Sequence, residues 1–405
     1  MSATTTTSAA PPAPAATVAA SANANGNTTK RVAVITGAGQ GIGAGIAVRL
    51  AKDGLDLVLS DLPSNRENLD KVAEECRANG AKVVVKDCDV ADEAQVKALV
   101  EATKELGGID VMVANAGIAP IYRFVDTPIS ALDQVYNVNV RGVYLCYQAA
   151  ARAMIEQGRG GKLIGAASTA GLRGAPNFSA YCASKHAVAG INAAVAEELA
   201  PHGITANCYA PTICETDMLT RIDKDLSAIA GAEAGAFIAM RKAAHPMGRN
   251  VKVSDVTDTV SWLASEGCKF VTGVLVPITV RSLVVSMFMP ELSSTWGTLL
   301  NPVHTPLTSL RRHPPANCYA PTICETDMLT RIDKDLSAIA GAEAGAFIAM
   351  RKAAHPMGRN VKVSDVTDTV SWLASEGCKF VTGVLVPITA VLVSVCSGVA
   401  GRGQK

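Results

Sequence analysis

Tyr181 and Lys185 are the pair of side chains whose types and spacing most directly suggest chemistry. They begin a predicted helix, 179–200, and side chains at positions i and i+4 of a helix lie on the same face. A free phenol has a pKa of about 10, and a neighbouring ammonium favours the phenolate and lowers that pKa. Ser168, just past a predicted strand, could hydrogen-bond a substrate oxygen as negative charge develops on it. The three side chains could reduce a carbonyl, unless Tyr181 is simply buried and Lys185 simply packs at a helix end.

A glycine-rich string, TGAGQGIG at 36–43, lies between a predicted strand and a predicted helix. Gly37, Gly41 and Gly43 allow a tight turn and let the backbone approach a pyrophosphate, which would sit on the N–H groups of the helix N-terminus. This placement predicts a dinucleotide site. The alternative is a tight turn between strand and helix with no ligand.

Asp61 follows the second predicted strand, 18 residues after Gly43. A carboxylate there could accept hydrogen bonds from the adenosine ribose and would repel a 2′-phosphate. We therefore expect NAD, with NADP less favoured. The alternative is a surface aspartate that opens the turn at 61–63.

Two more polar positions follow predicted strands, at Asp89-Val90 and at Asn115. An open parallel sheet places its ligand crevice at the carboxyl ends of its strands, so both could line a cofactor. Each is weak by itself, because turns favour Asn and Asp in any case.

Short β-branched runs alternate with helical stretches from Arg31 onward. Such alternation, with apolar strands, is typical of a parallel sheet covered on both faces, and right-handed crossovers then predict a doubly wound α/β sheet of the Rossmann type. The predicted strands are 32–36, 56–60, 82–86, 109–114, 162–167 and 204–208, and the predicted helices are 42–53, 66–79, 92–106, 129–157 and 179–200.

An exact repeat marks the C-terminal part of the chain: residues 206–279 recur letter for letter as 316–389. The repeat begins inside a predicted strand, which favours an exon duplication, an unusual splice product or a gene-model error over a repeat architecture. We therefore predict one catalytic domain over 31–279 and a surplus second copy. The remaining ranges are predicted as a disordered tail (1–30), an irregular linker (280–315) and a short tail (390–405).

The predicted sheet has one slot for the strand that begins each copy. Copy one enters it through residues 203–205, whereas copy two follows Pro314-Pro315, which lack N–H donors. Copy one is also tethered directly to the preceding helix, which makes its loop closure less costly. We expect copy two to dangle, to aggregate or to swap into a partner chain.

Composition excludes several classes of function. Lys and Arg total 37 against 36 Asp and Glu, which argues against nucleic-acid or anionic-membrane partners. The apolar runs are too short to span a membrane. Eleven Cys without a CxxC pair or a signal peptide indicate reduced thiols, and no Cys or His spacing predicts a metal site. These features predict a cytoplasmic protein without metal.

Together TGAGQGIG, ANAG (114–117), Asn139-Val140-Arg141-Gly142, Ser168 and YCASK (181–185) resemble the short-chain dehydrogenase/reductase family over about 31–273. The resemblance implies an NAD(P)-dependent oxidoreductase in which Tyr181 is the acid/base, Lys185 lowers its pKa and binds the nicotinamide ribose, Ser168 orients the substrate and Asn139 holds a proton-relay water. It also implies a homo-oligomer, tetramer or dimer. The implied cofactor contacts are Gly37, Gln40, Gly41, Ile42, Gly43, Asp61, Asp89, Val90, Asn115, Tyr181, Lys185 and Thr216.

Four further stretches, GAGQGIG and residues 135–142, 199–211 and 215–230, resemble acetoin/diacetyl reductases, also called 2,3-butanediol dehydrogenases. This implies hydride transfer between NADH and a small diketone or hydroxyketone, and the Ala-rich loop 212–245 suggests a small, apolar pocket. The alternatives are a family member with another substrate, such as a polyol, a steroid or a 3-oxoacyl group, and a non-catalytic chain spoiled by the duplication.

The chain departs from the family pattern after Gly273, where it reads VLVPIT. The family continues there into a last strand and a VDGG-like turn that complete the sheet and an oligomer contact. Thr212 also stands where the family usually has Gly, and Ala114 replaces the first Asn of the usual NNAG. Because neither copy supplies that turn, we expect the stability and the assembly of the chain to be reduced.

Overall fold

A computed structural model describes residues 28–279, except 244 and 246, and the pair 21–22. Of the second copy it describes 359–375, the strands 318–321 and 385–388, and a few positions between 330 and 349. The predicted linker 280–315 and the tail 390–405 lie outside the described residues. Within the predicted N-terminal tail, β1 (Ser21–Ala22) pairs antiparallel with β2 (Thr28–Thr29).

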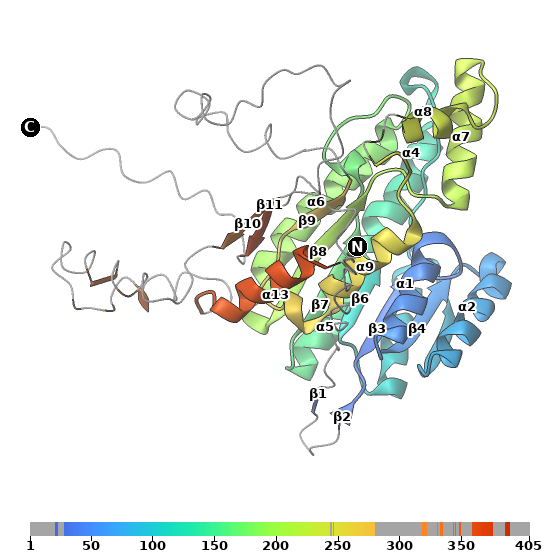
Figure 1. Ribbon diagram of the computed structural model, residues 1–405. Coiled ribbons are helices and arrows are strands. Elements are labelled where there is room, and N and C mark those ends of the chain that lie inside the picture. The colour runs from blue at the N-terminus through green and yellow to red at the C-terminus, as the bar shows by residue number, and fades with distance from the viewer. Residues whose placement is uncertain are drawn as a thin grey trace, which may run out of the picture.

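Seven parallel strands form the central sheet, in the order β5-β4-β3-β6-β7-β8-β9 (Figure 1). The chain runs outward from β3 to β5 and then returns to place β6 on the other side of β3, so the strand order reverses between β3 and β6. This is the predicted doubly wound Rossmann sheet. The strands are β3 (Val32–Thr36), β4 (Asp56–Asp61), β5 (Val83–Asp87), β6 (Val111–Ala114), β7 (Gly161–Ala166), β8 (Ile204–Pro211) and β9 (Leu275–Ile278).

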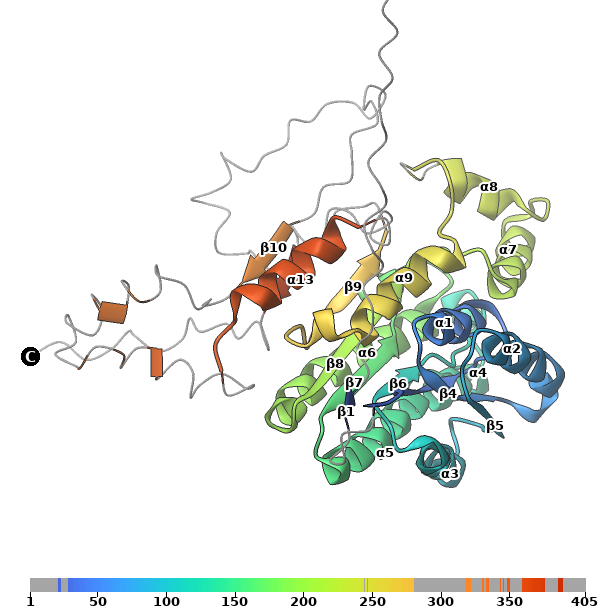
Figure 2. The same cartoon turned by 60° about the horizontal axis from the view of Figure 1, so that its bottom comes forward.

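Helices cover both faces of this sheet, as the two views in Figures 1 and 2 show. On one face α1 (Gly41–Lys52), α2 (Arg66–Ala78) and α9 (Val253–Ala264) pack on one apolar cluster. On the other, α3 (Glu93–Glu101), α5 (Gly142–Gln157) and α6 (Ser179–Leu199) pack on a second cluster. Alternate residues of β3 supply the two clusters, because successive side chains of a strand point to opposite faces.

The predicted helix 129–157 is not continuous. The structure has α4 (Ile129–Tyr136), a π-helical turn (Asn137–Arg141) and then α5. The predicted helix 92–106 likewise ends as the 3₁₀ turn Ala102–Leu106. A π-helical turn commonly marks a functional position within a helix.

The prediction of a loop over 212–245 is wrong, because two helices form there. They are α7 (Asp217–Ala230), which ends at Gly231 with φ +64°, and α8 (Ala236–Ala243). Inside this pair the Asp223 carboxylate accepts hydrogen bonds from the backbone N–H groups of Gly235 and Ile238. Asp223 thereby holds the turn that sets α8 against α7.

Copy one of the repeat supplies most of β8, which occupies the one position that the predicted sheet has for this strand. Copy one also supplies β9, the last strand of the sheet. VLVPIT forms β9, which pairs with β8 from Cys208–Leu275 to Pro211–Ile278. The buried Asn207 directs the chain into β9: its amide donates to the Val271 carbonyl at 2.7 Å and its Oδ1 accepts from Val274 N at 3.1 Å. β9 therefore completes the sheet without a VDGG-like turn, and the expected loss of stability and assembly stays a prediction.

Copy two stays outside the main sheet. Its β10 (Cys318–Pro321) pairs parallel with β11 (Leu385–Ile388), which repeats the pairing of β8 with β9, and its α13 (Val363–Leu373) repeats α9. The role of this segment as a surplus copy stays a prediction.

Seven cysteines lie between residues 28 and 279, and all seven are free and buried. Burial raises the pKa of the Cys208 and Cys268 thiols to about 12, which keeps them protonated. The described part of the chain holds no group of three His, Cys, Asp or Glu side chains suited to a metal ion. None of the helices in the described ranges is long and apolar enough to cross a bilayer.

Asn207→Ala should lower the free energy of unfolding by about 2–4 kcal/mol, because it leaves a buried carbonyl and a buried N–H at the start of β9 without their partner. Urea unfolding followed by circular dichroism measures the change. Asn79→Ala, at the exposed end of α2, is the matched control and should cost no more than about 0.5 kcal/mol. Equal losses in the two variants would contradict this role of Asn207.

Candidate active site

Tyr181 and Lys185 lie in the first two turns of α6, where the sequence predicted them. The Lys185 Nζ is 5.5 Å from the centroid of the Tyr181 ring and donates to the carbonyl of Ala166, at the end of β7, at 2.6 Å. Only 3% of Lys185 is exposed. Gly117 lies beside it, since a Cβ there would be 3.5 Å from Nζ, in van der Waals contact. The strand end therefore fixes the ammonium next to the phenol.

Ser168 follows β7 and caps the 3₁₀ turn Thr169–Gly171, accepting from Ala170 N at 3.1 Å. Its hydroxyl donates to the carbonyl of Pro211, at the end of β8, at 3.3 Å. It also hydrogen-bonds the Tyr181 hydroxyl. The two hydroxyls predicted to act on one substrate oxygen are thus brought together.

Asn139 is fully buried in the π-helical turn, and its amide is held at both ends. Oδ1 accepts from Ile118 N at 2.8 Å, while Nδ2 donates to Ile118 O at 2.9 Å and to Ser184 Oγ at 3.1 Å. Ser184 in turn donates to the carbonyl of Tyr181 at 2.7 Å. A chain of hydrogen bonds therefore joins the π-helical turn to the first turn of α6.

Burial shifts both titratable groups of the cluster. It raises the pKa of Tyr181 to about 12, although the hydrogen bond with Ser168 lowers it. It also lowers the pKa of Lys185 to about 8. For the chain alone, loss of hydration therefore outweighs the hydrogen bond with Ser168, and the expected lowering of this pKa by the ammonium together with a cationic nicotinamide stays a prediction. At neutral pH the site holds a neutral phenol beside a charged lysine.

The glycine-rich turn joins β3 to α1 and needs its glycines at specific positions. Gly37 and Gly41 have φ +63° and +56°, in the left-handed region. A Cβ on Gly43 would lie 2.0 Å from the carbonyl oxygen of Gly37, so only glycine lets α1 start this close to the strand. The side chain of the N-cap residue Gln40 makes no capping hydrogen bond, and the first turn, which includes Ile42, holds no acidic residue. The first N–H groups of α1 can therefore receive an anion.

Asp61 ends β4 beside this turn. Its Oδ2 accepts from Gly39 N at 2.8 Å and from the Asn65 amide at 3.0 Å, while Oδ1 accepts from Leu62 N at 2.8 Å. The carboxylate is half-buried and sits at the edge of the glycine-rich turn, where a ribose would follow a pyrophosphate.

Asn115 ties β6 to the glycine-rich turn across the point where the strand order reverses. Its amide donates to the carbonyls of Thr36 and Gly37 at 2.8 and 3.1 Å, and its Oδ1 accepts from the Tyr209 hydroxyl at 2.8 Å. The Thr36 hydroxyl accepts from the N–H groups of Asn115 and Ala116. Asn115 therefore holds the turn through its Nδ2 and contacts β8 through its Oδ1.

The remaining predicted cofactor residues lie around the same crevice. Thr216 packs on Gly41, where a Cβ would be 3.5 Å from its methyl group. Asp89 accepts from Ala91 N at 2.9 Å and shapes the turn that buries Val90. The structure thus brings Thr216 to the glycine-rich turn, whereas the Asp89 carboxylate is engaged in its own loop.

A cavity of about 720 Å³ opens at this end of the sheet. Ser168 and Tyr181 line it together with Ile42, an apolar residue in the first turn of α1. Further lining residues come from α7 and α8. The apolar members of its lining include Phe178, Met218, Leu219, Ile222, Leu226, Phe237 and Met240. The lining is therefore apolar, as expected. The volume includes the region beside Thr216, where the nicotinamide is expected, so the small size of the substrate pocket stays a prediction.

Sequence reasoning missed three residues that hold the site: Thr36, Ser184 and Tyr209. Ser184 had a usable signal, because position i+3 from Tyr181 faces the same side of the helix. Thr36 and Tyr209 had none, since their partners lie 79 and 94 residues away in sequence.

Comparison with known proteins agrees with this arrangement. A family described as short chain dehydrogenase matches residues 31–227. The chain is 42% identical over 231 residues to the short-chain dehydrogenase/reductase eriH of Hericium erinaceus, covering 56% of this chain and 88% of that one. It is 43% identical over 229 residues to the L-2,3-butanediol dehydrogenase of Corynebacterium glutamicum, covering 56% and 89%. Carveol dehydrogenase from Mycobacterium avium, solved in complex with NAD, superposes with a TM-score of 0.58 at 30% identity, covering 62% and 96%.

These relatives are matched over nearly their whole length, and the structural match covers most of a solved dehydrogenase. Residues 31–227, which the family model matches, contain the glycine-rich turn and the cluster of Ser168, Tyr181 and Lys185. The chain therefore belongs to the short-chain dehydrogenase/reductase family, oxidoreductases that bind NAD(P) and interconvert alcohols and carbonyl compounds.

Proposed function

We propose that this chain reduces a small ketone or diketone, such as diacetyl or acetoin, to the alcohol with NADH. The observation that carries the proposal is the placement of the Ser168 and Tyr181 hydroxyls on one cavity wall, with the Lys185 ammonium behind the phenol. The likeness to an L-2,3-butanediol dehydrogenase supports the substrate class.

The residues around the glycine-rich turn fit a dinucleotide. The uncapped N-terminus of α1 offers N–H groups and a positive dipole end to a pyrophosphate, and Gly43 keeps the approach open. Lys185 would donate to the nicotinamide ribose and Thr216 would contact the carboxamide. The bound cofactor would supply the hydride.

The charge of Asp61 supports NAD over NADP. Its carboxylate can accept from ribose hydroxyls and repels the 2′-phosphate that distinguishes NADP. The neutral Asn65, which donates to the same carboxylate, adds no positive charge that could offset this repulsion.

In the proposed reaction Tyr181 is the acid. Its phenol, kept protonated by burial, donates its proton to the carbonyl oxygen, while Ser168 hydrogen-bonds the same oxygen as charge builds on it. The phenolate that remains is stabilised by the adjacent Lys185 ammonium. Asn139 would be a positioning residue. It donates to Ser184, and Ser184 fixes the first turn of α6 by donating to the carbonyl of Tyr181.

The cavity favours a second candidate, a larger apolar ketone. The nicotinamide would occupy the part of this 720 Å³ cavity beside Thr216. Diacetyl, with six heavy atoms, would then contact little of the apolar lining from α7 and α8, whereas a cyclic or terpenoid-sized ketone would contact more of it. The ratio of kcat/KM for a cyclic diketone to that for diacetyl decides between the two. A ratio well above one would favour the larger substrate class.

Tyr181→Phe should reduce kcat by at least about a thousandfold and leave the Kd for NADH within about twofold, because it removes only the transferable proton. Tyr144→Phe, on the exposed face of α5, is the matched control and should behave as wild type. Substantial turnover by Tyr181→Phe would exclude this residue as the acid.

Asp61→Asn should shrink the preference for NADH over NADPH by about tenfold or more. The amide oxygen can still accept from Gly39 N, so the change removes charge while keeping the turn in place. The comparison requires kcat/KM for both cofactors with the same carbonyl substrate. Unchanged discrimination would show that another group sets it.

The kcat/KM for NADH should be constant at lower pH and fall as pH rises through about 8. Burial lowers the pKa of Lys185 to about 8, so above that pH the free enzyme loses the ammonium proposed to bind the ribose. Tyr181, with its pKa raised to about 12, stays protonated over this range and does not contribute. A flat profile between about pH 7 and about pH 10 would contradict the role of Lys185.

A further inference from the structure

The cavity beside Ser168 and Tyr181 has a mostly apolar lining that carries charge of one sign only. Its charged lining residues are Arg173 and Arg241, and none of the described residues that line it is an Asp or a Glu. Arg241 of α8 is already engaged in an interaction. Arg173 is half-buried and has neither an ion pair nor a hydrogen bond within the part of the chain that the structure describes. The cavity therefore holds a positive charge that its own lining does not balance.

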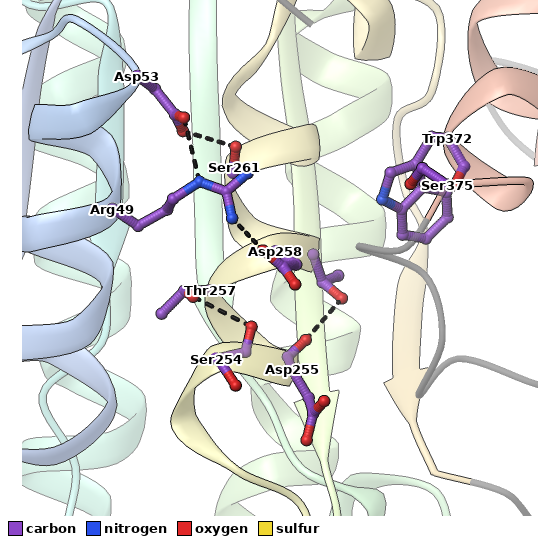
Figure 3. A network of polar contacts seen from close by, with 10 residues as sticks. Arg49, Asp53, Ser254, Asp255, Thr257, Asp258, Ser261, Trp372 and Ser375 are labelled. Carbon is purple, nitrogen blue, oxygen red and sulfur yellow. Dashed lines mark hydrogen bonds and ion pairs between the residues drawn. The ribbon is translucent and has the colours of Figure 1, made fainter. Parts of the chain in front are cut away.

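Other arginines that are half-buried in this fold have carboxylate partners. Arg49 of α1 forms ion pairs with Asp53 and with Asp258 of α9 (Figure 3). Arg249 likewise pairs with a buried aspartate of α9 at 2.7 Å. Removing a charged group from water without giving it a counter-charge costs free energy. Arg173, which lies in the cavity wall without such a partner, is therefore a position where an anionic ligand would supply the missing interaction.

The backbone that carries Arg173 is held close to the proposed reacting groups. Gly171 N donates to the carbonyl of Ser168 at 2.8 Å and closes the 3₁₀ turn after β7. A Cβ on Gly171 would lie 2.6 Å from the carbonyl oxygen of Lys185, so this turn packs directly on α6. Arg173 follows Gly171 by two residues. The guanidinium therefore belongs to the same short segment as the hydroxyl proposed to bind the reacting oxygen.

The loop that continues from Arg173 to α6 is fixed as well. Asn177 has φ +68°, the one positive φ at a residue other than glycine within the described ranges. Its carbonyl accepts from Tyr122 N at 3.3 Å. A left-handed backbone at such a residue is uncommon, and it persists where the surrounding structure determines it, often beside a functional site. Residues 173–178 therefore form a defined wall of the cavity.

The expected cofactor does not account for the charge of Arg173. The pyrophosphate would lie at the N-terminus of α1, and of the glycine-rich turn only Ile42 lines the cavity. The nicotinamide ring expected beside Thr216 is neutral in NADH and positively charged in its oxidised form, so it offers no anion. The substrate is therefore the source of negative charge that fits Arg173.

We propose that Arg173 makes this site selective for an oxo acid, a ketone whose carboxylate pairs with the guanidinium while its carbonyl oxygen lies at Ser168 and Tyr181. This inference rests on the proposed ketone reduction and narrows its substrate class. Arginine binds a carboxylate through two parallel charge-assisted hydrogen bonds, which are stronger than those between neutral groups. The apolar side chains of the lining would contact the carbon chain between the two polar ends.

The reaction leaves the carboxylate unchanged. The carbonyl carbon would receive the hydride of NADH, and the carbonyl oxygen would receive the proton of Tyr181. The products are a hydroxy acid and the oxidised cofactor, and Tyr181 regains its proton from water. Arg173 would take no part in these transfers, because it binds the end of the substrate that does not react.

The test compares each oxo acid with its methyl ester, which has the same ketone and no charge. Levulinate and its homologues with one, two and three further methylene groups vary the distance between ketone and carboxylate. At the best chain length, kcat/KM for the acid should exceed that for the ester by about tenfold or more. Arg173→Gln should lower this ratio by about tenfold or more, and Arg173→Lys by less, because lysine keeps the charge without the planar fork.

Arg152→Gln, at an exposed position of α5, is the matched control, because it removes the same charge elsewhere and should keep the wild-type ratio. A wild-type ratio near or below one for every acid, or a ratio that Arg173→Gln leaves unchanged, would overturn the proposal. Equal losses for acid and ester would also overturn it, since they would make Arg173 a structural residue. A Kd for NADH that rises more than about threefold in Arg173→Gln would assign the guanidinium to the cofactor instead.

Failure of the proposed function gives a different result. A chain that reduces no ketone, diacetyl included, would contradict the proposed function, and the role of Arg173 is then decided by binding alone. Calorimetry of the NADH complex should show a Kd for the oxo acids that Arg173→Gln raises by about tenfold or more. Equal Kd values for the wild type and Arg173→Gln, or no binding of any oxo acid to the wild type, would overturn the assignment.

Discussion

The hydrogen bond from the Lys185 ammonium to the carbonyl of Ala166 is the contact on which the arrangement of the site depends. It joins the first turns of α6 to the carboxyl end of β7, and the same strand end leads directly to Ser168. Because the ammonium is buried, its pKa falls to about 8, so Lys185 loses its proton at a lower pH than an exposed lysine would. The sheet supplies the carbonyl that keeps the charge in place, and in the proposed reaction this charge would stabilise the phenolate form of Tyr181.

The second requirement is that three strand ends meet closely enough to hold a dinucleotide. Asn115 links β6 to the glycine-rich turn through its Nδ2 and to Tyr209 of β8 through its Oδ1. Gly43 lets α1 begin against that turn, and Asp61 braces the turn from β4. These contacts explain why the predicted cofactor residues do not all face the crevice: several of them build it.

Patterns that depend on neighbouring residues could be predicted from sequence, including the strands, the order of motifs and the pairing of Tyr181 with Lys185 on α6. Features set by distant contacts could not. The π-helical turn at Asn139 depends on Ile118 and Ser184, and the volume of the cavity depends on how Asp223 sets α8 against α7. The helix α7 itself had a signal, an N-cap at Thr216 and a glycine at its end, which the Ala-rich composition obscured. The stacking of Trp372 of α13 on Trp262 of α9 was unexpected, because an exact repeat predicts likeness of structure and not contact.

The central claim is that this site transfers hydride from NADH to a carbonyl carbon while Tyr181 supplies the proton. The most direct measurement uses the full-length chain with NADH deuterated at C4 of the nicotinamide and diacetyl as the acceptor. Mass spectrometry should find deuterium on the carbinol carbon of acetoin, transferred from one face of the nicotinamide only. Binding of NADH without any transfer of deuterium to diacetyl or to a larger ketone would contradict the account.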